Sequence, residues 1–339
     1  MMFYNEPIFF EKNRVFRVYK GGKLFSEFFG DNSEDGNYPE EWVASSVRAL
    51  NKGSTDEYEG ISKIKGTDLY LNEAVEKYKS EILGERKDIG ILTKILDSAI
   101  RLPVQAHPDK EFSRKYFSSE YGKEESWIIL ATRPDAKIFY GFKDGVTLEE
   151  FSKAIDESEN SSDAMEKLLC SIEVKAGDVI YIPAKMVHAI GYGCLLLEVQ
   201  EPTDFTIQPE RWCGDYKLSD EEMYLGLSEK AALECFDMNK RFPAPLTPEV
   251  IEESEGLLYE SVIDEKITTS FNVKMITLDG AEFVLDKGAS IYVVLEGEGE
   301  IKGNDYSRKI KKGDYFLLPD CAKGNYTLCG KIKTAECYA

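Results

Sequence analysis

Histidine, a common metal ligand, is scarce in this 339-residue chain. It contains two histidines, His107 and His188. Its seven cysteines are odd in number and none has CxxC spacing, which excludes a disulfide framework and a zinc ribbon. We therefore expect free thiols in a reducing cytoplasm. No apolar run approaches the roughly 20 residues that a membrane helix needs, and residues 1–10 show no pattern of a secretory signal.

Positive charge is also in short supply. Lysine and arginine number 42 against 62 aspartates and glutamates, a net charge of −20. Such a chain is a poor candidate for general binding to nucleic-acid phosphates. A small anionic substrate remains compatible, because it requires only a few cations placed around it. Hydrophobic residues make up 42% and aromatic residues 12% of the chain, enough for a packed core, and the length predicts two domains.

Short apolar runs separated by turn residues predict a mainly β protein with helical inserts. The expected strands cover residues 102–106, 126–131, 179–182 and 194–199. The expected helical inserts cover about residues 64–101, 147–170 and 219–236. Capping-box patterns, Thr147 with Glu150 and Ser219 with Glu222, begin the last two inserts. The proline-rich segment 242–248 predicts a boundary between a domain 1–241, which contains the inserts, and a domain 242–339.

An internal repeat predicts that the two domains share one architecture. Residues 175–184 and 311–320 each contain a Gly-Asp turn, an apolar strand and then proline, 136 residues apart. Two copies of one β element, among many short strands, predict two jelly-roll barrels. His188 follows the first copy, whereas the matching position after the second is Gly324. The second barrel is therefore expected to be degenerate and to brace the first.

Four polar residues near predicted strand ends are candidates for a metal site. Gln105 and His107 are two residues apart and share one face of a strand. Glu125 begins another strand, and His188 follows a third. An amide oxygen, two imidazoles and a carboxylate suit a borderline divalent ion such as Zn²⁺. The alternative interpretation, polar residues satisfied in the core and a surface glutamate, remains open on spacing alone.

Three motifs resemble those of the type I mannose-6-phosphate isomerases, which are zinc-dependent cupins. They are Gln105-Ala-His107-Pro-Asp-Lys110, Gly122-Lys-Glu-Glu125-Ser-Trp127 and Pro183 with His188-Ala. The resemblance covers most of the chain and implies the short two-cupin form. It implies one Zn²⁺ per chain, although another divalent transition metal also suits these ligands. The implied ligands are Gln105, His107, Glu125 and His188.

The resemblance also implies residues that act on the substrate. Glu198 matches an acidic active-site residue and is our candidate general base, and Lys110 continues the first motif near the substrate. The family usually has an arginine where this chain has Gln208. We expect Arg211, three residues later, to reach the same space as a catalytic and substrate-binding residue. Ser45 is a further candidate for phosphate binding. Other basic residues near the motifs are Arg101, Arg114 and Lys185.

The implied function is a metal-dependent aldose–ketose isomerase of carbohydrate metabolism. It would interconvert mannose 6-phosphate and fructose 6-phosphate through an enediol, in the cytoplasm. Two alternatives stay open: an isomerase of a different sugar phosphate, which Gln208 favours, and a non-catalytic cupin that binds metal and sugar. The expected partner is a small sugar phosphate, without nucleic acid or membrane, and the expected state is a monomer or homodimer.

Overall fold

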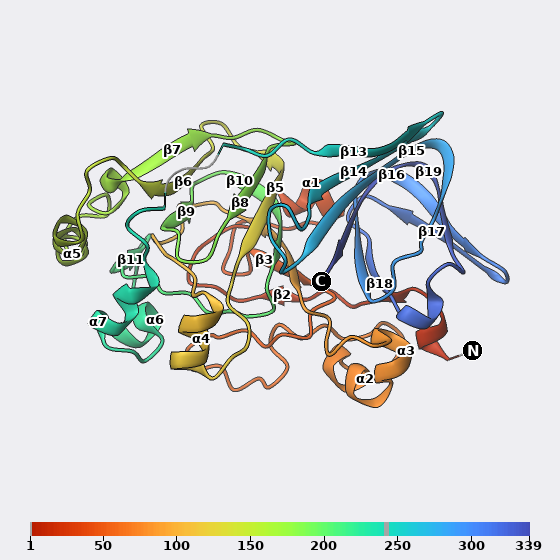
Figure 1. The fold of residues 1–339 in the computed structure, drawn as a ribbon, viewed down its shortest axis with the longest axis horizontal. Coiled ribbons are helices and arrows are strands. Elements are labelled where there is room, and N and C mark those ends of the chain that lie inside the picture. Colours follow the sequence, from red (N-terminus) through yellow and green to blue (C-terminus); the bar gives the residue numbers. More distant parts are fainter. Residues whose placement is uncertain (1, 241–243) are drawn as a thin grey trace.

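The computed structural model describes residues 2–240 and 244–339, which form two β barrels side by side (Figure 1). The sheet of the first barrel has the strand order β2-β3-β4-β10-β5-β8. These strands are β2 (Arg14–Val15), β3 (Glu40–Val43), β4 (Leu92–Asp97), β5 (Glu125–Thr132), β8 (Val179–Ile182) and β10 (Cys194–Gln200). A small sheet completes this barrel with β6 (Lys137–Phe142), β7 (Leu169–Glu173) and β9 (His188–Ile190).

A larger sheet forms the second barrel. Its order is β1-β18-β16-β19-β15-β14-β13, with β17 paired to β16. The strands are β1 (Ile8–Phe9), β13 (Glu249–Ser254), β14 (Leu257–Ile263), β15 (Asn272–Val284), β16 (Ser290–Gly303), β17 (Tyr306–Lys311), β18 (Tyr315–Leu318) and β19 (Thr327–Tyr338). The amino-terminal β1 thus belongs to the carboxy-terminal sheet. The predicted domain boundary between residues 241 and 242 lies outside the described residues.

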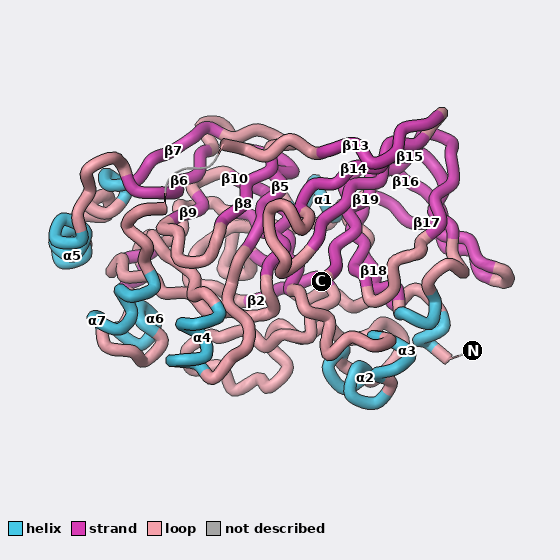
Figure 2. Tube along the Cα trace, in the orientation of Figure 1, coloured by secondary structure: helices cyan, strands magenta, loops and turns pink. Residues whose placement is uncertain are grey.

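Helices lie around the barrels rather than inside them (Figure 2). The α-helices are α1 (Phe25–Phe29), α2 (Leu71–Lys77), α3 (Lys79–Leu83), α4 (Lys110–Phe117), α5 (Leu148–Glu157), α6 (Asp220–Tyr224) and α7 (Glu229–Ala232). The 3₁₀ turns are η1 (Phe3–Asn5), η2 (Glu166–Leu168), η3 (Leu233–Cys235) and η4 (Asp320–Ala322), and a short hairpin joins β11 (Trp212–Cys213) to β12 (Tyr216–Lys217). Both predicted capping boxes are confirmed, at α5 and α6.

The predicted helical inserts are partly wrong. Residues 64–101 contain α2 and α3, but Leu92–Asp97 is the central strand β4. Every residue of β4 is buried because the strand faces the barrel interior on one side and the second barrel on the other. Burial on both sides removes the alternation that identifies a strand. Residues 147–170 contain α5 and only a 3₁₀ turn, and the strand expected over 102–106 is reduced to isolated bridges at Gln105 and Ala106.

Separate hydrophobic cores fill and join the barrels. The interior of the first barrel is packed around Trp127 and Tyr140, and that of the second around Tyr292 and Phe316. The outer faces of both sheets share a further core, in which Ile95 and Leu197 of the first barrel join Val273 and Ile291 of the second. This shared core holds the two barrels together through buried apolar surface, the main favourable term in folding.

The internal repeat has the same local structure in both barrels. Gly177 and Gly313 have φ angles of +93° and +89°, which glycine adopts readily. In each copy the backbone N–H of the lysine donates to the aspartate side chain, at 2.9 Å from Lys175 and 2.8 Å from Lys311. The strand that follows is β8 in one barrel and β18 in the other. Two barrels built on one β element are therefore confirmed.

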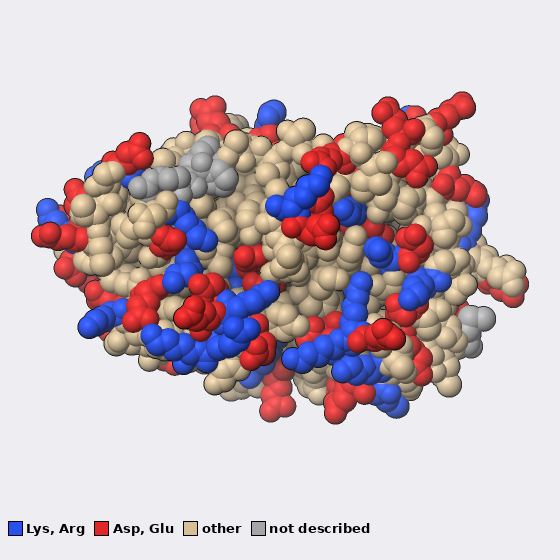
Figure 3. Space-filling model, viewed as in Figure 1, with Lys and Arg blue, Asp and Glu red and all other residues tan. Residues whose placement is uncertain are grey.

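The surface carries both signs of charge despite the net charge of −20. Figure 3 shows acidic and basic side chains interspersed over much of the face that it presents. Among the described residues, no helix is both long and apolar enough to cross a membrane. Positive charge around an anionic ligand must therefore come from a few lysine or arginine side chains at its binding site.

Candidate metal centre and active-site cleft

The two histidines meet in the first barrel. Their ring centroids are 4.7 Å apart, and one carboxylate lies between them. Glu125 Oε2 is 3.2 Å from His107 Nε2, and Glu125 Oε1 is 3.3 Å from His188 Nε2. All three side chains are buried, and their candidate ligand atoms lie within 4.8 Å of one another. Residues far apart in the sequence thus form a compact group that can hold a metal ion.

The local strand pairing explains why these side chains converge. Glu125 begins β5, and His188 begins β9. Gln105 and His188 exchange two backbone hydrogen bonds of 2.9 and 2.8 Å. This bridge brings the Gln105 amide to 3.3 Å from His188 Nε2. Amide nitrogen and oxygen differ little in shape, so a reversed Gln105 amide presents its oxygen to the same group.

Backbone carbonyls fix the protonation of both imidazoles. His107 Nδ1 donates to Phe205 O at 3.0 Å, and His188 Nδ1 donates to Met186 O at 2.8 Å. A carbonyl oxygen only accepts, so each Nε2 keeps its lone pair toward Glu125. Burial and the Lys123 ammonium lower the pKa of His107 to about 3, and burial lowers the pKa of His188. Both imidazoles are therefore neutral at pH 7, the form that binds metals.

Glu125 supplies the negative charge of the group. Burial alone would raise its pKa, but the Lys123 ammonium holds the pKa of Glu125 well below its ordinary value. Lys123 Nζ is 3.1 Å from Glu125 Oε2 and 2.9 Å from His107 Nε2. Oε2 is buried, and among the described residues none forms a hydrogen bond of good geometry with it. A buried anionic oxygen beside two imidazole lone pairs fits a borderline divalent cation.

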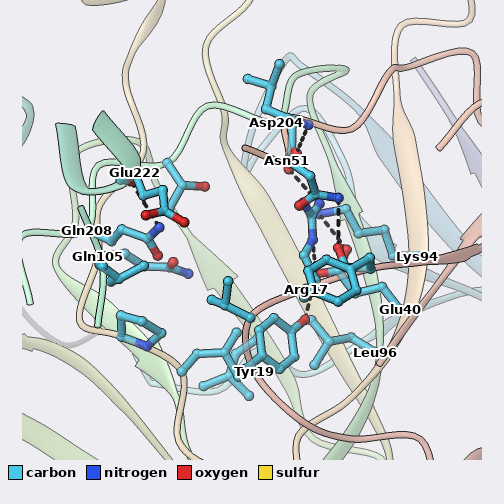
Figure 4. Close-up of a pocket in the computed structure, with 18 of the residues that line it drawn as sticks. Arg17, Tyr19, Glu40, Asn51, Lys94, Leu96, Gln105, Asp204, Gln208 and Glu222 are labelled. Carbon is cyan, nitrogen blue, oxygen red and sulfur yellow. Dashed lines mark hydrogen bonds and ion pairs between the residues drawn. The ribbon is translucent and has the colours of Figure 1, made fainter. Parts of the chain in front are cut away.

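A cleft opens beside this group. Gln105, Lys123 and Glu125 line its inner end together with Glu198, which is 3% exposed. Figure 4 shows Gln105, Gln208 and Glu222 on one side of the cleft and Arg17, Glu40 and Lys94 on the other. The second of these walls is a chain of buried ion pairs. Metal donors and an additional carboxylate therefore border one space that a small molecule can enter.

Strand register places Glu198 and Lys94 together. They are directly opposed on β10 and β4, and Lys94 Nζ donates to Glu198 Oε1 at 3.0 Å. Burial would lower the pKa of Lys94, but Glu198 and Glu40 raise it above the ordinary value. Burial raises the pKa of Glu198 and outweighs the opposing effect of Lys94. Glu198 thus binds a proton more readily than an exposed glutamate, as a proton-transferring group should.

Comparison with known proteins identifies the family. Residues 265–339 match the family model described as mannose-6-phosphate isomerase, cupin domain. Mannose-6-phosphate isomerase ManA of Bacillus subtilis is 31% identical over 325 residues, which cover 93% of each chain. The chain belongs to the mannose-6-phosphate isomerase family. The mannose-6-phosphate isomerase of Streptococcus mutans is 27% identical, over 94% of each chain.

Solved structures of mannose-6-phosphate isomerases share the fold. The Bacillus subtilis enzyme superposes with a TM-score of 0.78 over 98% of this chain and 99% of the other, at 24% identity. A single-residue variant of phosphomannose isomerase from Salmonella typhimurium gives 0.71 at 16% identity, over 98% and 99% of the two chains. The predicted fold class, mainly β with cupin barrels, is thereby confirmed.

Several residues of this chain that were predicted to act on the substrate lie away from its cleft. Lys110, 43% exposed, is 3.3 Å from Glu201 and donates to Ser270. Ser45 is buried, and its hydroxyl bonds the backbone of Val47. Neither side chain lines the cleft. The Ser45 hydroxyl closes a local turn, and Lys110 begins α4, outside the barrel.

Arg211 also points elsewhere. Its guanidinium pairs with Asp220 at 2.8 Å and with Glu159 at 3.3 Å, outside the cleft. Gln208 does line the cleft, and its amide donates to the carbonyl oxygen of Glu222 at 3.1 Å. In this structure two carboxylates hold the Arg211 guanidinium outside the space beside Gln208. Arg101, Arg114 and Lys185 likewise pair with carboxylates elsewhere.

Sequence reasoning missed the cations that do line the cleft. Among the described residues these are Arg17, Lys52, Lys94 and Lys123. Lys123 lies within the quoted Gly122–Trp127 motif, so its position two residues before Glu125 was an available signal. Lys94 was hidden in a segment with helical spacing. Arg17 and Lys52 lie in segments whose contacts depend on the completed fold.

Proposed function

We propose that this chain interconverts mannose 6-phosphate and fructose 6-phosphate through an enediol, with one zinc ion bound by Gln105, His107, Glu125 and His188. The observation that carries the proposal is the buried His107–Glu125–His188 group at the end of a cleft that also contains Glu198. The 31% identity to an enzyme named mannose-6-phosphate isomerase supports the choice of reaction.

The reaction moves one proton between C1 and C2 of the sugar and another between O2 and O1, while negative charge gathers on these two oxygens. A bound divalent ion supplies Lewis-acid stabilisation of that charge. Glu198 is the general base, because its burial favours uptake of a proton and it lines the same cleft. Lys94 holds the Glu198 carboxylate in position through their 3.0 Å hydrogen bond. Glu198 and Lys94 are both buried, so little water competes for the charges of their ion pair.

The proposal includes a cytoplasmic location. All seven cysteines, each within the described residues, are free thiols, which supports a reducing compartment. We keep the expectation of a monomer or homodimer, which size-exclusion chromatography with light scattering decides. The substrate remains a small sugar phosphate.

The test combines elemental analysis with a coupled assay. The purified protein is expected to contain one zinc ion per chain and to convert mannose 6-phosphate, with turnover lost on chelation and restored by zinc. His188→Ala should lose both metal and turnover while its circular dichroism stays unchanged. Absence of turnover in the zinc-loaded wild-type protein would contradict the proposed reaction.

A second candidate is isomerisation of a different sugar phosphate. Gln208, in place of the arginine that the family resemblance implies, favours it. The same assay with other aldose and ketose phosphates decides between the two. Stoichiometric zinc without turnover of any sugar phosphate would instead indicate a non-catalytic sugar-binding cupin.

A further inference from the structure

The cleft must neutralise the phosphate of its proposed substrate, although the residue at position 208 is uncharged. Three of the four cations in the described cleft lining are already engaged. Arg17 donates to Glu40 at 3.0 Å and to Asp204 at 3.0 Å, and its side chain is 12% exposed. Lys94 pairs with Glu198, and Lys123 with Glu125, with exposures of 4% and 5%. These cations balance carboxylates of the cleft itself.

Lys52 differs from the other three. Its side chain is 48% exposed, and its ion pair with Glu222 is long, at 3.7 Å, beyond hydrogen-bond distance. Its ammonium donates to Ser219 Oγ at 2.9 Å. An ammonium has three donors, so further donors can serve an anion. Both Glu222 oxygens, in contrast, already accept hydrogen bonds, from Tyr216 and from Ser219.

Hydrogen bonds to residues on the cleft wall fix the segment that carries Lys52. The backbone N–H of Leu50 donates to Asp204 at 2.8 Å, and the Asn51 side chain accepts from Arg17 at 3.0 Å. The Asn51 amide also donates to Phe16 O at 2.8 Å. Figure 4 shows Asn51 and Glu222 on opposite sides of the cleft. Lys52, next to Asn51, therefore extends across the opening to the Ser219 side.

The chemistry of a hexose 6-phosphate fits this placement. Its C1 and C2 oxygens belong beside the metal donors, which are buried, so C6 and its phosphate point toward the exposed end of the cleft. We propose that Lys52 binds the substrate phosphate at the cleft mouth and thereby sets the preference for phosphorylated over neutral sugars. Glu222, 3.7 Å from the same ammonium, weakens this binding and makes it selective for a strongly charged group. The inference rests on the proposed function for the orientation of the sugar.

The test measures the affinity for mannose 6-phosphate and for mannose by calorimetry, together with steady-state kinetics. Lys52→Gln should weaken binding of mannose 6-phosphate about tenfold, the effect of losing one charge-assisted hydrogen bond. Its affinity for mannose should not change, and KM should rise far more than kcat falls. Lys52→Arg should restore most of the affinity. Lys153→Gln, at an exposed position of α5, is the matched lysine control and should match the wild type.

A second variant reverses the sign. Glu222→Gln keeps the side-chain acceptor of the capping box but removes the competing charge, so it should lower KM for mannose 6-phosphate a few-fold. Equal loss of mannose and mannose 6-phosphate binding in Lys52→Gln, or unchanged binding of both, overturns the proposal. Lys52-dependent binding without turnover by the wild type supports the phosphate site and contradicts the proposed isomerase. Normal turnover with an unchanged KM in Lys52→Gln would support the proposed isomerase and contradict the phosphate site at Lys52.

Discussion

The two barrels place matching residues at the same positions of their sheets, yet one can hold a metal and the other is filled. In the first barrel Glu125 lies opposite Ile182, and in the second Ser290 lies opposite Leu318. Ile182 and Leu318 are equivalent in the internal repeat, so Ser290 stands where the first barrel has Glu125. Gly324 likewise stands where the first has His188.

The neighbouring strands extend the comparison. Glu198 lies opposite Trp127 and Lys94, whereas Glu336 lies opposite Tyr292 and Lys274. The second barrel thus keeps a carboxylate and a lysine at the matching positions.

Their contacts differ, however. The hydroxyls of Tyr292 and Tyr259 donate to Glu336 at 2.5 and 3.1 Å, and Lys274 donates to Ser261 at 2.7 Å. The ring of Tyr292 also stacks on Phe316, with centroids 4.9 Å apart. The two barrels therefore share a β framework and differ in a few side chains that point inward. Ion pairs line the cleft of the first barrel, whereas aromatic rings fill the same part of the second.

Removing the Glu125 carboxylate, the proposed metal ligand that lies between the two histidines, tests the comparison with the largest effect. Glu125→Gln should reduce zinc affinity and turnover more than about a hundredfold, since losing even a residue that supports a ligand costs 10- to 100-fold. The matched variant Ser290→Ala should leave both unchanged. Zinc content and coupled turnover are the measurements. Retained zinc in Glu125→Gln would place the metal elsewhere.

The two matched lysines should differ next most strongly. Lys94→Met leaves the buried carboxylate of Glu198 without its cation, which should cost about 3–5 kcal/mol of unfolding free energy. Because Lys94 lowers the pKa of Glu198, its loss raises that pKa further, and the acid limb of the pH–rate profile should move to higher pH.

Two variants serve as controls for this effect. Lys94→Arg keeps the charge and should leave the acid limb near its wild-type position. Lys274→Met removes a lysine whose pKa burial already lowers, so it should destabilise less and leave the pH profile of turnover unchanged. Equal pH profiles for Lys94→Met and the wild type would mean that Lys94 does not control the pKa of Glu198.

Much of the fold and of the metal group could be predicted from the sequence. The predicted strand 179–182 coincides with β8, and both capping boxes are present, because these features depend on local sequence. The convergence of His107 and His188 was left open by spacing alone and was implied by the resemblance of the motifs to those of the family, and the two rings do meet. Such signals lie within a few consecutive residues.

The polar walls of the cleft could not be predicted in the same way. Lys94 resembles a surface lysine in a helical pattern, and only the pairing of β4 with β10 reveals its partner Glu198. Lys110 and Arg211 were chosen because they are close in sequence to the motifs, but side chains from other elements hold them outside the cleft. Pairing between distant charges depends on tertiary structure, which sequence spacing does not encode.

The matched carboxylates should show the smallest effect, in the pH dependence of stability. Burial raises the pKa of Glu336 in the folded protein and outweighs the hydrogen bonds from Tyr292 and Tyr259. Below the ordinary glutamate pKa of 4.5 both folded and unfolded chains are protonated. As the pH rises above 4.5, the unfolded chain releases this proton before the folded chain does. The free energy of unfolding therefore falls until the pH reaches the raised pKa of Glu336 in the folded protein.

Glu336→Gln should therefore be more stable than the wild type near neutral pH, by about 1 kcal/mol, and should lose that advantage in acid. Urea unfolding across this pH range measures the difference. Glu125→Gln should have the opposite sign, because Lys123 holds the pKa of Glu125 low and its ionised form stabilises the fold. Destabilisation of both variants at neutral pH would mean that ionised Glu336 is as well compensated in the filled barrel as Glu125 is in the metal-binding one.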